Sequence, residues 1–138
     1  KYTSESFAFL HKTAKEFEDE FNEIPNHQLN SLTEAISLSE FSEGLTKTAL
    51  VRNRYENIIA NNSTRVKLQG RNSEDDYINA NYCLDGRVIV SQGPLDEGCG
   101  GYDQHHEDFY EMIFQQNVTS ILMLTNYIEN GRIKCAEY

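Results

Sequence analysis

The first part of the chain carries apolar residues at helical spacing. Steps of three and four separate five apolar side chains, which is the spacing of one face of an amphipathic helix. We expect Thr3 or Ser4 to cap this helix, and Pro25 lies just after its expected end. The five apolar residues are Phe7, Leu10, Ala14, Phe17 and Phe21.

A second, shorter helix is predicted next. Ser31 and Glu34 have the spacing of a capping box, in which each side chain bonds the backbone amide of the other residue, so this helix would begin at Leu32. Gly44 and the polar residues around it would break the helix before an arginine-rich segment at residues 51–68.

The middle of the chain consists of short segments rich in valine, isoleucine and tyrosine. Residues 64–68 (TRVKL), 76–82 (DYINANY) and 87–92 (RVIVSQ) have this composition, and turn-forming residues separate them. These segments predict three β-strands. Asp85 and Gly86 predict a hairpin between the second and third of them.

Further helix and strand segments are predicted towards the end of the sequence. Residues 95–106 are rich in glycine and predict a loop, and residues 107–117 predict a helix that stops near Asn117. Residues 119–124 (TSILML) form a continuous apolar run, which predicts a strand buried on both faces. A turn at residues 129–132 would lead into a last strand. Helices followed by strands favour an α+β or α/β fold.

Length, charge and cysteine content narrow the possible functions. A chain of 138 residues forms one domain at most, and no apolar run approaches the roughly 20 residues of a membrane-spanning helix. A net charge of −10 disfavours nucleic acid and anionic membranes as partners. Three cysteines without a C-x-x-C pair favour a reducing compartment over a disulfide framework. Because the first residue is lysine, we expect a piece of a longer protein.

Positive charge is concentrated in one segment of this acidic chain. Residues 47–67 hold five basic residues and one acidic residue, a net charge of +4, so the other 117 residues sum to −14. The basic residues are Lys47, Arg52, Arg54, Arg65 and Lys67. Such a segment indicates either an anionic ligand or internal ion pairs, and composition alone favours the ion pairs.

Six motifs in order resemble one protein family. They are NRYENI, DYINANY, SQGPL, DFYEMIF, ILMLT and ENGRIKCAEY, and the resemblance covers about residues 52–138. Their order and approximate spacing resemble the catalytic domains of classical protein tyrosine phosphatases. The resemblance implies an α/β (α+β) fold in which N-terminal helices precede a highly twisted mixed sheet flanked by helices. Residues 1–138 would be the N-terminal part of a single domain, with helices in residues 1–50 and a substrate-recognition loop and sheet in residues 51–138.

The resemblance also implies roles for four residues. Tyr55 would wall a deep slot that holds the phosphotyrosine ring, and Asn57 would bond the backbone of the substrate peptide. Glu129 would orient a phosphate-binding arginine, and Lys134 would lie near the mobile loop that carries the general acid. Without the motifs, these residues would be interpreted as a core tyrosine, a turn-capping asparagine and two solvated charges.

Other motif residues are expected to form the framework of the site. Tyr77, Ile78, Asn79 and Ala80 would pack and hydrogen bond the sheet, and Gln92, Gly93 and Pro94 would shape a turn beneath the site. In the resembling family the arginines of the 51–68 segment pair with carboxylates, and their charge would steer a dianionic substrate without gripping its phosphate.

The catalytic residues of the family are absent from this sequence. Its chemistry needs a cysteine followed six positions later by arginine, and none of Cys83, Cys99 and Cys135 satisfies this spacing. The chain also lacks tryptophan, and with it the tryptophan-proline-aspartate loop of the general acid. We therefore expect these 138 residues alone to be inactive. We expect Cys135 to be a buried small hydrophobe and Cys99 to be a more exposed thiol.

No cofactor or metal is expected. The loop at residues 100–107 and the residue after it bring two aspartates and two histidines close in sequence, and solvated side chains are the expected outcome there. These residues are Asp103, His105, His106 and Asp108. Phosphoryl transfer through a cysteinyl intermediate requires no metal.

Three functional hypotheses remain open from the sequence. The first is a protein tyrosine phosphatase, cytoplasmic or in the intracellular part of a receptor, that acts on phosphotyrosine proteins and needs the remainder of its domain. The second is a pseudophosphatase module that binds phosphotyrosine without cleaving it. The third is a self-contained interaction domain unrelated to phosphate. No nucleic-acid or membrane contact is expected of this segment.

Overall fold

The computed structural model describes residues 12–23, 38–96 and 99–138, which belong to two compact units, Lys1–Ile36 and Ser37–Tyr138. The first unit contributes one helix, α1 (Ala14–Glu23). Thr13 caps it, because its hydroxyl accepts a hydrogen bond from the Glu16 amide at 3.3 Å while the Glu16 carboxylate accepts from the Thr13 amide at 2.6 Å. The predicted cap at Thr3 or Ser4 lies outside the described residues, and the helix in fact starts at Ala14.

The second unit begins with two short helices, η2 (Leu38–Leu45) and α2 (Lys47–Leu50). The predicted start of a helix at Leu32 lies outside the described residues. Gly44 does not break the helical segment, since η2 continues through it to Leu45. Its lack of a side chain serves packing instead, because a Cβ at Gly44 would collide with the side chains of Ile59 and Tyr77.

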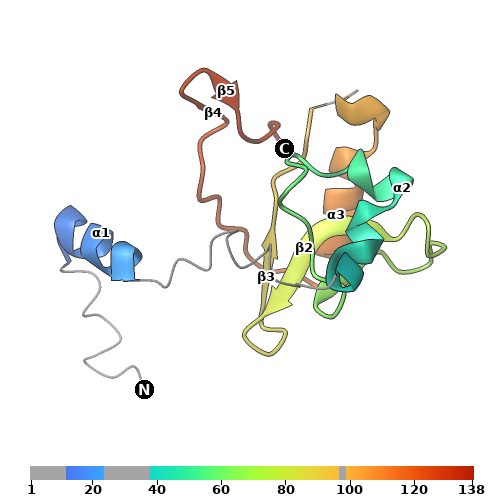
Figure 1. The fold of residues 1–138 in the computed structure, drawn as a ribbon, viewed down its shortest axis with the longest axis horizontal. Coiled ribbons are helices and arrows are strands. Elements are labelled where there is room, and N and C mark those ends of the chain that lie inside the picture. The colour runs from blue at the N-terminus through green and yellow to red at the C-terminus, as the bar shows by residue number, and fades with distance from the viewer. Residues whose placement is uncertain (1–11, 24–37, 97–98) are drawn as a thin grey trace. The chain divides into compact units, whose positions relative to one another are not determined.

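A three-stranded antiparallel sheet forms the centre of this unit (Figure 1). Its strands are β1 (Arg65–Lys67), β2 (Tyr77–Cys83) and β3 (Val88–Ser91), in the order β1-β2-β3. All three predicted strands are therefore confirmed. The predicted hairpin joins β2 to β3, where Asp85 and Gly86 both have positive φ. Every strand pair among the described residues is antiparallel.

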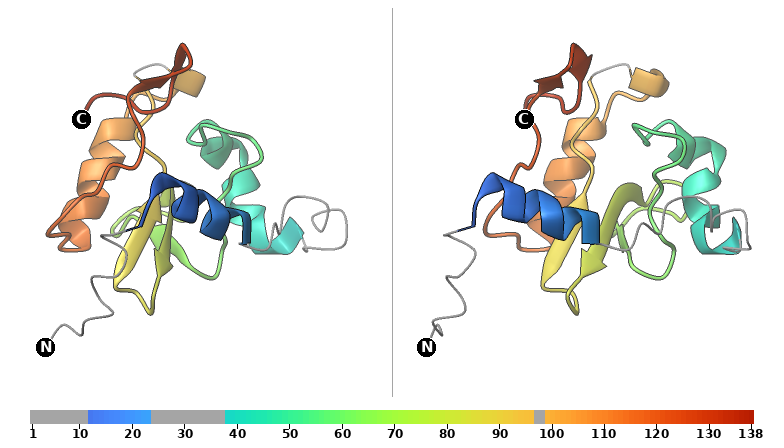
Figure 2. Two further views of the ribbon diagram at one scale, coloured as in Figure 1. Left: turned by 90° about the vertical axis from the view of Figure 1, so that its left-hand side faces the viewer. Right: turned by 60° about the vertical axis from the view of Figure 1, so that its left-hand side comes forward.

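Strand β2 is buried on both faces over its first four residues. Ile78 and Ala80 point to one face, where they pack with apolar residues of β1 and α3 (His105–Gln115), whereas Tyr77 belongs to a second apolar cluster with Ala49 of α2 and Ala60. Figure 2 shows α3 and α2 on opposite sides of the sheet. The sheet therefore separates two apolar cores. The segment between α2 and β1 packs on the same face of the sheet as α2.

Helix α3 confirms the prediction of a helix in this part of the chain, and it begins two residues earlier than expected, at His105. It ends at Gln115, and Asn117, with φ of 51°, marks the stop that the sequence predicts. The preceding glycine-rich loop contains one short 3₁₀ turn, η3 (Cys99–Gly101). None of the helices in the described part of the chain has the length and apolar content needed to cross a bilayer.

The predicted buried strand at residues 119–124 is wrong. This segment has no regular secondary structure, and Leu122 and Leu124 are 81% and 88% exposed. A strand needs a neighbour for its backbone hydrogen bonds, and no described strand pairs with this segment. An apolar sequence is typical of a buried strand, but it does not show whether a neighbouring strand is present to pair with it.

A small hairpin completes the described chain. Strands β4 (Ile128–Glu129) and β5 (Arg132–Ile133) pair antiparallel, and Asn130 and Gly131 both have positive φ in the turn between them. Left-handed conformations at both central positions are the geometry of a tight hairpin turn, for which Asn-Gly is the favoured sequence. The predicted turn is confirmed, and the strand after it is limited to two residues.

We predict that Tyr77→Phe lowers the free energy of unfolding by about 1–3 kcal/mol, because it leaves the buried amide of Ala60 without its hydrogen-bond partner and removes one of the two donors to Asn53 Oδ1. The Tyr77 hydroxyl donates to Asn53 Oδ1 at 2.8 Å and accepts from the Ala60 amide at 3.3 Å. Urea unfolding of the full protein measures the change. The matched control is Tyr110→Phe, at an exposed tyrosine of α3, which should shift the free energy by less than about 0.5 kcal/mol. Equal effects of the two substitutions would contradict the prediction.

Candidate functional site

Tyr55 lies in an irregular segment that is fixed by the residue before it. The Arg54 amide donates to Gln92 Oε1 at 3.0 Å, and the Arg54 guanidinium donates to the carbonyls of Pro94 at 2.8 Å and Ile133 at 3.3 Å. One residue therefore joins the segment to the turn after β3 and to the β4–β5 hairpin. These contacts bring Tyr55 next to residues almost 80 positions away in sequence.

Asn53 forms a second, buried anchor. Its amide nitrogen donates to the Gly44 carbonyl at 3.1 Å, and its oxygen accepts from the Tyr77 hydroxyl at 2.8 Å and from Asn79 Nδ2 at 2.9 Å. Asn79 also donates to the carbonyl of Ile58 at 2.7 Å. The chain on both sides of Tyr55 is thus bonded to β2, through the Asn53 side chain before it and the Ile58 carbonyl after it, which confirms the predicted framework role of the DYINANY motif.

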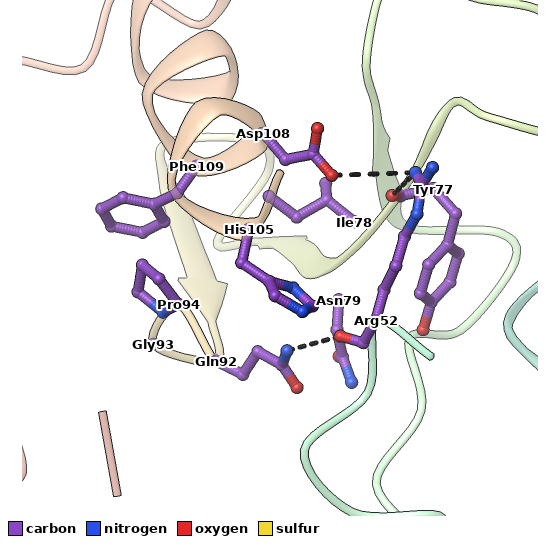
Figure 3. Close-up of a pocket in the computed structure, with 10 residues that line it drawn as sticks. All are labelled: Arg52, Tyr77, Ile78, Asn79, Gln92, Gly93, Pro94, His105, Asp108 and Phe109. Atoms are coloured by element: carbon purple, nitrogen blue, oxygen red, sulfur yellow. Dashed lines mark hydrogen bonds and ion pairs between the residues drawn. The ribbon is translucent and has the colours of Figure 1, made fainter. Parts of the chain in front are cut away.

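Arg52 is the third anchor and is only 5% exposed. Its Nη1 donates to the carbonyls of Asp75 and Tyr77, each at 2.8 Å, and its guanidinium pairs with the carboxylate of Asp75. Asp108 in the first turn of α3 lies 3.8 Å from the same Nη1, and Gln92 Nε2 donates to the Arg52 carbonyl at 2.6 Å (Figure 3). A buried arginine requires such compensation, because removing its charge from water is costly.

A cavity of about 20 Å³ lies beside Arg52, between α3 and the turn at Gln92 and Pro94 (Figure 3). A volume of this size holds about one water molecule, so it cannot accept a phosphotyrosine ring. Tyr55 does not line it. The cavity therefore belongs to the support beneath the segment rather than to a substrate slot.

Tyr55 itself is 45% exposed, so it is not a core tyrosine. Lys134 Nζ donates to its hydroxyl at 3.0 Å and lies 5.5 Å from the centroid of its ring. This hydrogen bond lowers the pKa of the Tyr55 phenol, and the charges of Lys134, Arg54 and Arg132 act in the same direction. Two of the residues singled out from the sequence, Tyr55 and Lys134, are therefore in contact.

The other two residues singled out from the sequence are not brought into that contact. Glu129 Oε1 accepts from the Thr125 hydroxyl at 2.9 Å and from the Asn126 amide at 3.1 Å. The bond from the Asn126 amide, followed by that from Thr125, lowers the pKa of the Glu129 carboxyl. Its carboxylate pairs with no arginine among the described residues. Asn57 is exposed, two positions after Tyr55.

The arginines of the 51–68 segment are mainly structural. Arg65 Nη2 pairs with Asp76 at 2.8 Å and its Nε pairs with Glu43, so both Arg52 and Arg65 are buried in ion pairs as expected. Arg54 differs from that expectation, because it bonds main-chain carbonyls and no carboxylate of the described residues. Main-chain acceptors carry no sequence signal, which is why this contact was not predicted.

The two histidines are not free side chains of a solvated loop. His105 is buried, its Nε2 lies 3.2 Å from the Cys99 carbonyl, and burial lowers its pKa. His106 Nε2 lies 3.0 Å from the carbonyl of Glu137. Asp108 instead accepts from the Tyr102 hydroxyl at 2.6 Å. In the described ranges, no three His, Cys, Asp or Glu side chains are grouped to hold a metal ion.

The thiols are distributed as the sequence suggests. Cys135 is 3% exposed, and burial raises the pKa of its thiol, so it is a poor nucleophile. Cys99 and Cys83 are both exposed. The expectation of a buried Cys135 and an exposed Cys99 is confirmed.

Sequence reasoning missed Asp108 and Tyr102 as part of the support. Asp108 is 3% exposed and faces Arg71 Nη1 at 2.7 Å, while the ring of Tyr102 lies 4.3 Å from the Arg52 guanidinium carbon. Burial, followed by the bond to Asp108, raises the pKa of Tyr102 to about 12. An aspartate in the first turn of a helix is already favoured by the helix dipole. The position of Asp108 in the sequence therefore does not indicate that it pairs with a distant arginine.

The known proteins that this chain resembles in sequence are tyrosine phosphatases. A family model described as protein-tyrosine phosphatase matches residues 49–138. Receptor-type tyrosine-protein phosphatase zeta of Rattus norvegicus is 44% identical over 96 residues, which cover 63% of this chain and 4% of that protein. Tyrosine-protein phosphatase 1 of Dictyostelium discoideum is 40% identical over 113 residues, covering 78% of this chain and 20% of that protein.

A solved structure shares the fold. The catalytic domain of human protein tyrosine phosphatase non-receptor type 18 matches with a TM-score of 0.64 and 27% sequence identity, over 90% of this chain and 43% of that chain. The chain therefore spans less than half the length of the relatives named here, and the mixed α and β architecture predicted from the sequence is confirmed.

We predict that Lys134→Met raises the pKa of the Tyr55 phenol towards its ordinary value, because the substitution removes both the hydrogen bond and the charge that lower it. A carbon NMR titration of protein carrying ring-labelled tyrosine measures this shift. Lys67→Met, at another exposed lysine, is the control and should leave the Tyr55 titration unchanged. An unaltered Tyr55 pKa in Lys134→Met would show that the contact does not persist in solution.

Proposed function

This chain belongs to the protein-tyrosine phosphatase family, and we propose that the whole protein hydrolyses phosphotyrosine in other proteins through a cysteinyl-phosphate intermediate. The observation that carries the proposal is an exposed Tyr55 on a segment anchored by three consecutive residues, within the matched range of residues 49–138. A buried Tyr55 would have been incompatible with a role in contacting substrate. Its ring is available to a ligand, and its backbone is held in place.

Tyr55 is proposed to wall the slot for the phosphotyrosine ring. Ring packing contributes about 0.5–1.5 kcal/mol beyond simple area burial, and a wall of fixed height favours phosphotyrosine over the shorter phosphoserine. Asn57, exposed two positions later, is proposed to bond the peptide backbone, since an amide side chain can both donate and accept. The contacts of Arg52, Asn53 and Arg54 hold the segment that carries these two side chains.

Glu129 and Lys134 are proposed as supporting groups. Glu129 would orient the phosphate-binding arginine, and its second carboxylate oxygen has no bond that would prevent this among the described residues. Lys134 contributes positive potential at the Tyr55 hydroxyl, where a dianionic substrate would enter. Neither residue carries out the bond-breaking step.

The nucleophilic cysteine, its arginine and the general acid are proposed to come from residues outside these 138, so residues 1–138 would be the N-terminal part of one phosphatase domain. In support, the chain covers 43% of the matched catalytic domain, and none of its cysteines is followed by arginine at the sixth position. The protein would act in phosphotyrosine signalling, in the cytoplasm or in the intracellular part of a receptor. Exposed, unpaired Cys83 and Cys99 are consistent with such a reducing compartment.

We predict that Tyr55→Ala in the full protein lowers kcat/KM for a phosphotyrosine peptide by roughly tenfold or more, whereas Tyr55→Phe keeps most of the activity because it retains the ring. Phosphate release from the peptide measures both effects. Tyr110→Ala, at an exposed tyrosine on α3, is the matched control and should change kcat/KM by less than about twofold.

The same assay separates the proposal from the alternative of a pseudophosphatase. Phosphotyrosine peptide that binds to the full protein without release of phosphate would favour the binding module. Failure to bind the peptide at all would contradict both functions. Equal activity of Tyr55→Ala and the unaltered protein would leave the reaction standing but remove Tyr55 from the site.

A further inference from the structure

The β4–β5 hairpin places an arginine next to the Tyr55 segment. The hairpin is held there by two contacts, from Arg54 Nη1 to the Ile133 carbonyl at 3.3 Å and from Lys134 Nζ to the Tyr55 hydroxyl at 3.0 Å. Arg132 belongs to β5, immediately precedes Ile133 and Lys134 in sequence, and is exposed. Its charge is close enough to act on the Tyr55 phenol.

The guanidinium of Arg132 lacks an ion-pair partner among the described residues. Its cross-strand neighbour is Glu129, whose carboxylate would be the obvious partner. That carboxylate is instead engaged by the Thr125 hydroxyl and the Asn126 amide. The Glu129 carboxylate is therefore bonded through Oε1 to the segment before β4 and makes no ion pair with Arg132.

This arrangement differs from that of the other arginines. Arg52, Arg65 and Arg71 are each paired with carboxylates, and Arg54 bonds two carbonyls. Arg87, in the β2–β3 turn, donates to the carbonyl of its own turn residue Leu84. The chain has a net charge of −10, which repels anions overall. The guanidinium of Arg132, unpaired among the described residues and near the exposed Tyr55 side chain, would attract an anion locally.

We propose that Arg132 is a specificity-determining residue that pairs with an acidic side chain next to the phosphotyrosine of a bound peptide. This inference rests on the proposed function, because it takes Tyr55 as the wall of the phosphotyrosine slot. A peptide that enters the slot extends over neighbouring surface, and the hairpin forms part of that surface. Guanidinium and carboxylate groups match in a forked, two-bond geometry, which makes arginine more selective for a carboxylate than lysine is.

The positive charge that the hairpin offers fits one acidic side chain rather than a polyanion. Arg132 and Lys134 are the cations that the hairpin offers, and Lys134 already donates to Tyr55. A single exposed pair is worth about two- to fivefold in affinity and weakens as salt rises. The effect would therefore rank substrates rather than decide whether the protein acts on phosphotyrosine.

Two phosphotyrosine peptides that differ only in glutamate or glutamine beside the phosphotyrosine test the proposal in the full protein. We expect the unaltered protein to prefer the glutamate peptide by about two- to fivefold in kcat/KM, and Arg132→Gln to reduce that preference to near unity. Arg132→Glu should reverse it. Raising the salt concentration should diminish the preference of the unaltered protein but not that of Arg132→Gln.

Arg87→Gln is the matched control, since it removes an equal charge from an exposed turn elsewhere in the unit. It should keep the preference for the glutamate peptide. If it reduced the preference as much as Arg132→Gln does, the effect would come from net charge and the proposal would be wrong. An unaltered protein that treats the two peptides equally would also overturn it.

Hydrolysis of p-nitrophenyl phosphate, an aryl phosphate without flanking residues, separates the proposed hydrolysis from the proposed role of Arg132. If the unaltered protein cleaves this compound but shows no preference between the peptides, the proposed function stands and the role of Arg132 is excluded. If the protein cleaves none of the three compounds, the proposed hydrolysis fails. Peptide affinities measured by fluorescence anisotropy then still decide whether Arg132 selects the acidic peptide.

Discussion

The position of Tyr55 depends on hydrogen bonds made by the three residues that precede it. Arg52 reaches into the support formed by β2 and α3, Asn53 bonds the buried Tyr77 and Asn79, and Arg54 crosses to the turn after β3 and to the hairpin. Each of these polar groups would be costly to bury without its partners. The partners come from five separate parts of the sequence, so the segment adopts its conformation only when the sheet, the helices and the hairpin have assembled around it. An exposed aromatic ring held by a rigid backbone is the result.

Local patterns in the sequence were sufficient for the elements that are defined by their own residues. Strands β1 to β3 follow from their content of valine, isoleucine and tyrosine, the Asn-Gly turn follows from turn chemistry, and the end of α3 follows from the helix stop near Asn117. The segment at residues 119–124 was mispredicted because a strand is defined by its neighbour, and apolar composition says nothing about which neighbour is present. In the site, Tyr55 and Lys134 came from a family resemblance, whereas the carbonyl partners of Arg54 could not be predicted since every residue carries the same acceptor.

Charge serves two different purposes in this chain. Arg52 and Arg65 are buried and each lies close to two carboxylates, and losing those carboxylates would leave an unpaired charge in the interior. Such pairs hold the structure together without offering anything to a ligand. Arg132 lies at the surface, where pairing is worth less but remains open to a second molecule. The cluster of basic residues at positions 47–67 is therefore mostly internal support, and the cation proposed for recognition, Arg132, lies outside that cluster in β5.

The bonds from Arg54 to main-chain carbonyls have a consequence for how the sequence can vary. The acceptors belong to the backbone at positions 94 and 133, so replacing either side chain leaves the oxygen in place as long as the chain keeps its path. The donor belongs to one side chain, and lysine cannot reproduce its fork. Related sequences should thus differ freely at position 133 while retaining arginine at position 54, a one-sided tolerance that pairs of opposite charges do not show.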